Sequence, residues 1–131
     1  MSRRAPFSEI RTYNFPLQDL GAAAEVFSFR GPLDKDGVIL QIGGAVVETF
    51  ACDNTAAALL VGTAADANLF AQLNIPDATA DLVFWSEEND PDAILTRIPK
   101  NTLVQFSGQN GVDAGTEAGM VIPILVIEWA P

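Results

Sequence analysis

The stretch AGMVIPILVIEW, residues 118–129, alternates with a period of two and is apolar in both registers. Successive side chains of a strand point to opposite faces, so this stretch predicts a strand that is covered on both faces. Pro123 lies in its middle and cannot donate a hydrogen bond to a neighbouring strand, which is typical of edge strands and bulges. Either another chain covers one face of an edge strand, or the strand is bulged inside one thick sandwich. The first alternative predicts an interface formed by Met120, Ile122, Pro123, Ile124 and Val126.

The same period recurs along the rest of the chain. In AEVFSFR, residues 24–30, Phe27 and Phe29 share one face. GVILQIGGAVVETF, residues 37–50, predicts a long strand with a bulge or bend at Gly43–Gly44. Short strands separated by frequent turn residues indicate an all-β fold, specifically an antiparallel β-sandwich or jelly roll.

One segment, LLVGTAADANLFAQLNI at residues 59–75, departs from this pattern. An apolar run ends at Gly62, and Asp66 is suited to cap the N-terminus of a helix. Three apolar residues then fall on one helical face: Leu69, Phe70 and Leu73. We expect one short helix over residues 66–74 that closes an end of the sandwich.

The length of 131 residues fits a single domain with its own core. We divide the chain into an extended N-terminal arm, residues 1–15, and a β-sandwich domain, residues 16–131. Arginines alternate with aromatic residues in the arm, and both types are enriched at interface hot spots. The arm is therefore expected to lie on a neighbouring subunit, with a frayed terminus as the alternative. Its predicted contact residues are Arg3, Arg4, Phe7, Arg11, Tyr13 and Phe15.

The formal net charge of −10 disfavours binding to nucleic acids and to anionic membranes. No stretch approaches the roughly 18 consecutive apolar residues of a membrane-spanning helix, and no apolar region follows the first arginines as in a secretory signal. A single cysteine, Cys52, indicates synthesis in a reducing compartment. We therefore expect neither nucleic acid nor membrane as a partner.

The chain has no histidine, which excludes Ser-His and Cys-His nucleophile pairs and histidine-ligated zinc. Cys52 is followed by Asp53, whose charge disfavours a thiolate, so we interpret the cysteine as a core residue. The glycine-rich residues 107–119 lack the lysine of a phosphate-binding loop and are interpreted as a mobile connection. The sequence thus predicts no enzyme, no cofactor and no metal.

Two acidic clusters need a separate explanation. LDKDG, residues 33–37, opens like a calcium loop but lacks the distal glutamate. SEENDPDA, residues 86–93, is best interpreted as a solvated hairpin tip. A weak cation site and the carboxylate pair of a glycosidase beside Trp85 are the alternatives. The acids concerned are Glu87, Glu88, Asp90 and Asp92.

Three parts of the chain resemble one protein family, the small structural proteins of tailed bacteriophages. LLVGTAADANLFAQLNI resembles a strand, Gly-Thr and acidic-helix segment of that family. YNFPLQDLGAAAEVFSF, residues 13–29, resembles the opening of those proteins. IPKNTLVQFSG, residues 98–108, followed by a glycine-rich loop and AGMVIPILVIEW, resembles their ending. The resemblance covers most of the chain from about residue 13 onward.

This resemblance implies a jelly-roll or Greek-key sandwich, a homotrimer and no catalysis. It implies a capsid decoration (cement) protein on the virion surface, made in the cytoplasm of the bacterial host, with the major capsid protein and copies of itself as partners. Two other functions on the same fold stay open. One is a tail or fibre component or host-surface carbohydrate-binding module, and the other is a glycan-cleaving depolymerase that uses Glu87 or Glu88.

Overall fold

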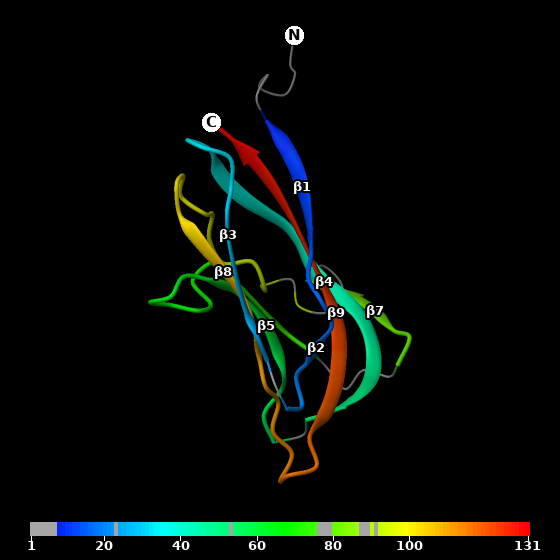
Figure 1. Cartoon of the computed structure of the whole chain (residues 1–131). Helices are drawn as coiled ribbons and strands as arrows, with labels where there is room; N and C mark the ends of the chain where they lie inside the picture. The colour runs from blue at the N-terminus through cyan, green and yellow to red at the C-terminus, as the bar shows by residue number, and fades with distance from the viewer. Residues whose placement is uncertain (1–7, 23, 53, 76–79, 87–89, 91) are drawn as a thin grey trace.

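The computed structural model describes residues 8–22, 24–52, 54–75, 80–86, 90 and 92–131, and these form two antiparallel sheets (Figure 1). One sheet has the strand order β1-β9-β4-β7, with β2 also paired to β9, and the other has the order β3-β8-β5-β6. The strands are β1 (Glu9–Asn14), β2 (Gln18–Asp19), β3 (Val26–Arg30), β4 (Asp36–Ala51), β5 (Ala58–Gly62), β6 (Ala71–Asn74), β7 (Val83–Trp85), β8 (Leu103–Gln109) and β9 (Ala118–Ala130). The prediction of an all-β chain with two antiparallel sheets is confirmed.

The final strand, β9, lies inside its sheet, with β4 on one side and β1 and β2 on the other. Of the two alternatives for this strand, the edge strand is therefore wrong. The strand lies inside the sandwich, and its pairing with β4 contains register shifts. In an antiparallel pair the N–H and C=O of one residue face the same neighbour. The carbonyl of Pro123 accepts a hydrogen bond from the Phe15 N–H at 3.2 Å, so the missing donor of the proline faces the link between β1 and β2. Proline is tolerated in this central strand because the neighbouring strand is interrupted at that point.

The partner of β9 along most of its length is β4, and the two glycines of β4 pair regularly with it. The register shifts lie between Ile39 and Gln41 and after Val46, so the predicted bulge at Gly43–Gly44 is wrong. Close approach of strands explains the glycines instead. A Cβ on Gly43 would lie 2.2 Å from the carbonyl oxygen of Phe84, so a side chain there would push β7 away from β4.

The core lies between the two sheets and is built from the inward residues of every long strand. Phe27 and Phe29 share one face of β3 and pack against this core, as predicted. Trp129 is 1% exposed, and its indole N–H donates a hydrogen bond of 2.9 Å to the Tyr13 hydroxyl. The largest other buried side chains are Phe70, Phe84, Phe106, Leu20, Ile42, Leu59, Leu73, Ile98, Leu125 and Ile127.

The structure moves the boundary of the predicted arm, because residues 9–14 form β1 and pair with β9 of the same chain. Tyr13 stacks on Phe29 with ring centroids 4.5 Å apart, and Phe15 stacks on Phe106 at 4.0 Å. Both side chains therefore close the sandwich instead of reaching a neighbour. Arg11 stays exposed and forms an ion pair of 2.9 Å with Glu9. The other predicted arm contacts, Arg3, Arg4 and Phe7, lie outside the described residues.

The predicted helix over residues 66–74 is also wrong, because residues 71–74 form β6 and pair with β5. Leu73 lies opposite Leu59, and the alternation of buried and more exposed residues in β6 follows the strand period. The segment before it is a hairpin loop, closed by a hydrogen bond of 2.9 Å from the Thr63 N–H to the Asp66 carbonyl. Phe70 and Leu73 are buried, as predicted, whereas Leu69 is 41% exposed, so only two of the three residues close this end of the sandwich.

Replacing Phe15 by alanine tests whether this residue belongs to the core. Truncation of fully buried phenylalanines costs about 3–5 kcal/mol, and Phe15 is half-buried, so we expect a loss of about 2–3 kcal/mol in the free energy of unfolding. Urea unfolding followed by circular dichroism measures the change.

Leu17→Ala is the matched control, since Leu17 lies two residues away and is 46% exposed. This variant should lose less than about 1 kcal/mol. Equal losses in the two variants would show that Phe15 does not join the sheets.

Candidate protein-binding surface

The outer face of the β1-β9-β4-β7 sheet is the main surface candidate, and the strand register defines it. Directly paired residues of neighbouring strands point to the same face of a sheet. Each outward residue of β9 therefore begins a row that crosses the sheet. The rows are Ile10–Glu128–Val38, Thr12–Val126–Gln41, Asn14–Ile124–Gly43–Trp85, Ile122–Ala45–Val83 and Asp19–Met120–Glu48.

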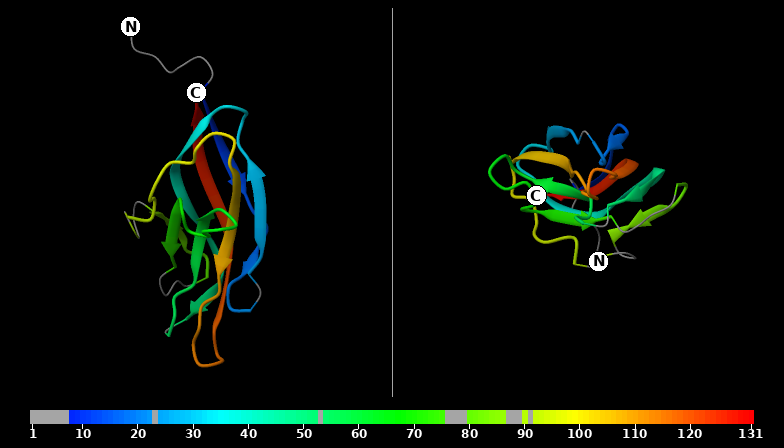
Figure 2. Two further views of the ribbon diagram at one scale, coloured as in Figure 1. Left: turned by 90° about the vertical axis from the view of Figure 1, so that its left-hand side faces the viewer. Right: turned by 90° about the horizontal axis from the view of Figure 1, so that it is seen from below.

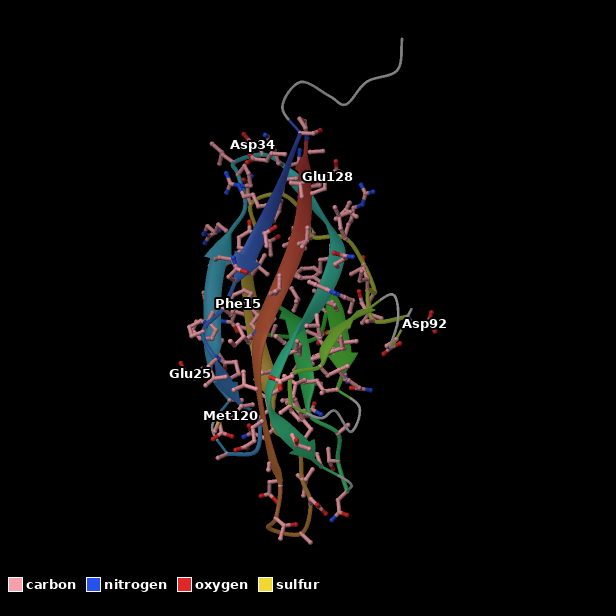
Figure 3. All side chains as sticks on the ribbon, turned by 90° about the vertical axis from the view of Figure 1, so that its right-hand side faces the viewer. Phe15, Glu25, Asp34, Asp92, Met120 and Glu128 are labelled. Atoms are coloured by element: carbon pink, nitrogen blue, oxygen red, sulfur yellow. The ribbon has the colours of Figure 1, made fainter. Side chains whose placement is uncertain are left out.

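The large apolar side chains in these rows form what we term the apolar face: Ile10, Val38, Val83, Trp85, Met120, Ile122, Ile124 and Val126. Four of them are substantially exposed, namely Val83 at 51%, Ile10 at 47%, Ile122 at 41% and Val38 at 37%. The other four are half-buried. Figure 3 looks onto this side of the molecule, where β9 and β4 run side by side between the labelled Met120 and Glu128, and β1 lies beside the half of β9 near Glu128.

Charged residues occur only in the first and last of these rows. Glu128 lies in the first row, and Asp19 and Glu48 lie in the last. The Asp19 carboxylate accepts a hydrogen bond of 3.1 Å from the Gly21 N–H, and that of Glu48 accepts one of 3.1 Å from the Gly119 N–H. The three middle rows carry no charge, on a chain whose net charge is −10.

The outer face of the other sheet differs in composition. Half of its outward positions are amides and hydroxyls, and some of the amides bond to one another: Gln72 donates to Asn74 at 3.0 Å, and Asn68 donates to Gln72 at 2.7 Å. Val26 and Leu103 are its exposed apolar residues. Amides and hydroxyls hydrogen-bond to water, so this outer face is suited to solvent. The outer faces of the two sheets therefore differ in composition.

Four of the five interface residues predicted on the last strand lie on the apolar face: Met120, Ile122, Ile124 and Val126. Pro123 does not, because it is buried and points toward the core side of the sheet. Sequence analysis missed Ile10, Val38 and Val83. Their alternation within each strand was visible, but only the register shows that they share a face with Ile124.

The acidic clusters are partly explained by local hydrogen bonds. The Asp90 carboxylate accepts one of 3.2 Å from the Asp92 N–H, and the Asp36 carboxylate accepts one of 2.9 Å from the Lys100 N–H. Glu87 and Glu88 lie outside the described residues. Within the described ranges, no group of three or more acids and cysteines is close enough to hold a metal ion, and no pocket was found. Trp85 lies over Gly43, since a Cβ there would be 2.6 Å from its ring.

Cys52 is 9% exposed, and its thiol lies 3.5 Å from the Ala118 carbonyl. Burial raises the pKa of this thiol above its ordinary value. Less of the thiol is then ionised at neutral pH, and the thiolate is the reactive form. The interpretation of Cys52 as a core residue agrees with this environment.

The glycine-rich loop between β8 and β9 extends beyond the other strands at one end of the molecule (Figures 1 and 2). Its backbone donors are used internally, because the Glu117 carboxylate accepts hydrogen bonds from the N–H groups of Asp113 at 3.2 Å and Gly115 at 3.0 Å. The backbone of Glu117 itself, followed by the N–H groups of Asp113 and Gly115, lowers the pKa of this carboxyl below its ordinary value. The negative charge that these N–H groups bind is therefore supplied by Glu117 of the same loop.

Comparisons with protein-family models, with curated proteins and with solved structures found no match to this chain. No helix in the described residues is long and apolar enough to cross a membrane.

The reactivity of Cys52 can be measured directly. At pH 8 we expect the native protein to react with a disulfide reagent at least about tenfold more slowly than the urea-unfolded chain, because the native thiol is buried and its pKa is raised. Equal rates would show that this cysteine is open to solvent.

The Glu117 bonds predict a pH-dependent loop. Because the folded pKa is lowered, the bonds stabilise the loop above the ordinary value of 4.5 and are lost as the pH falls through the lower folded value. The Gly115 amide proton should therefore titrate in NMR spectra with a midpoint below 4.5, and Glu117→Gln should abolish this titration. The Gly111 amide, bonded to the Leu20 carbonyl at 2.9 Å, is the internal control and should stay unchanged.

Proposed function

We propose that this chain is a non-enzymatic structural protein of a bacteriophage virion, a capsid decoration (cement) protein located on the capsid surface. The observation that carries the proposal is the apolar face, a broad surface with three uncharged rows on a small, highly acidic domain. Contiguous exposed apolar patches on soluble domains mark protein–protein contacts. A protein whose function is assembly needs such a surface, and it needs no pocket.

The proposed fold is a jelly roll, and the strand order supports it. β1 and β2 both pair with β9, so they can be counted as two halves of one strand. Eight strands then form two sheets of four, with the first strand beside the last. Jelly rolls of eight strands occur in viral capsid domains and also in lectins, so the choice between functions rests on the surfaces.

Decoration proteins act by burying area across several capsid subunits. A standard specific interface of about 1,600 Å² suffices for each contact when it is well packed. In this proposal the chain associates with copies of itself as a homotrimer and binds the major capsid protein, and three linked contacts add avidity. Arg3, Arg4 and Phe7 remain the proposed capsid contacts before β1. Synthesis takes place in the cytoplasm of the bacterial host.

A second candidate is a tail or fibre component that binds host-surface carbohydrate. Its support is the amide-rich outer face of the β3-β8-β5-β6 sheet, which includes Gln72 and Asn74, because amides are common hydrogen-bonding partners of sugar hydroxyls. Binding of the isolated protein to a glycan array, lost on replacing Gln72 by alanine, would favour this function over decoration.

The decoration function predicts saturable binding to purified phage heads that lack this protein. Deleting residues 1–7 should weaken the binding at least about tenfold, because it removes two arginines and a phenylalanine suited to interfaces. The matched control is the full-length chain with Leu95→Ser, which alters one exposed apolar residue elsewhere. Electron microscopy of the decorated heads then gives the copy number and symmetry.

No binding of the full-length chain to such heads would contradict the decoration function. Unchanged binding of the shortened chain would remove residues 1–7 from the mechanism and leave the function intact. Density on the tail of the assembled virion would support the second candidate instead.

A further inference from the structure

We propose that the apolar face joins copies of this chain to one another. The inference rests on the self-association part of the proposed function. It assigns to named residues a face-to-face contact between two copies, which is two-fold and therefore separate from the three-fold contact of the proposed homotrimer. Its centre is the row Asn14–Ile124–Gly43–Trp85, with Val126 on one side and Ile122 on the other.

Charge favours a second copy as the occupant. The chain carries −10, so two copies repel each other wherever their acidic surfaces meet. The three middle rows of the apolar face have no charge, and two of the three carboxylates at its ends are hydrogen-bonded to backbone N–H groups. This is therefore the side of the sheet on which copies can approach without burying unpaired charges. A basic partner would instead be drawn to the acidic remainder of the surface.

Shape points to the same occupant. The exposed apolar residues are mostly isoleucine and valine, which rise to similar heights from neighbouring strands, and no pocket was found among the described residues to receive a single protruding anchor. Sheets pack face to face at about 10 Å when their side chains share the same strand spacing and twist. A second copy of this face has the same strand spacing and twist, because it has the same fold.

The area is sufficient for a stable contact. Strands rise about 3.3 Å per residue and lie about 4.8 Å apart, so Met120–Glu128 and the three flanking strands span roughly 25 Å by 19 Å. If both faces are treated as flat, their contact buries about 900 Å² in total. Side chains make the surfaces uneven and raise this area to the ~1,000 Å² expected of a specific interface. In the described strands of the other sheet, the exposed apolar residues of the outer face are Val26 and Leu103.

The test measures the mass of the full-length chain by light scattering during size-exclusion chromatography, from low to high micromolar concentration. The wild type should be an oligomer that dissociates on dilution. The double variant Ile122→Thr/Ile124→Thr keeps β-branched side chains, which favour strands, and removes apolar surface from the face. Its association should weaken at least about 30-fold.

The matched control is Val26→Thr/Leu103→Thr, which makes the same kind of change on the outer face of the other sheet. It should associate like the wild type. Circular dichroism and thermal unfolding establish that each variant is folded, and Val83→Thr provides a milder change at an exposed edge position if the double variant unfolds. A monomeric wild type, or equal association of the two double variants, overturns the inference. Neither result bears on binding to phage heads, which is measured separately with the whole chain.

Discussion

The pairing of β4 with β9 is the constraint on which the rest of the structure depends. It runs from Asp36 opposite Ala130 to Ala51 opposite Ala118 and joins the two longest strands of the chain. Every other strand of that sheet is attached to one of these two, β1 and β2 to β9 and β7 to β4. The long pairing also aligns two alternating apolar patterns, so one set of side chains enters the core and the other is presented outward.

The outward set gives the molecule its most distinctive surface. A sandwich of this size needs one apolar side on each sheet, and the β3-β8-β5-β6 sheet follows that rule with amides and hydroxyls facing water. The β1-β9-β4-β7 sheet is apolar on both sides. Leaving such a face in water is unfavourable by roughly 25 cal/mol per Å² of apolar surface, and a protein that assembles recovers this free energy on contact. This difference between the two outer faces is the basis of the assembly function that we propose.

Closure of the sandwich relies on aromatic contacts between segments far apart in the sequence. Tyr13 stacks on Phe29 and accepts a hydrogen bond from Trp129, and Phe15 stacks on Phe106. These contacts attach β1 and the residue that follows it to both sheets. Sequence analysis assigned Tyr13 and Phe15 to an arm because arginines and aromatic residues alternate there. In β1 both Arg11 and Tyr13 lie on the inward face of the strand, where Tyr13 packs on Phe29 and Arg11 reaches solvent and pairs with Glu9. Pattern alone does not distinguish a core partner in the same chain from a partner in another one.

The sequence by itself determined the strand period, the two-sided apolar character of residues 118–129 and the core positions of Phe27, Phe29 and Cys52, because alternation and composition are local properties. Only the tertiary structure decided that β9 is central, that Gly43 permits close approach of β7, and that residues 71–74 form a strand. It also decided that Ile10, Val38 and Val83 share a face with Ile124. Each of these depends on which strands pair and in which register, and that choice is made by contacts between residues distant in the chain. The free energy of the whole sheet selects the register, so no single segment contains it.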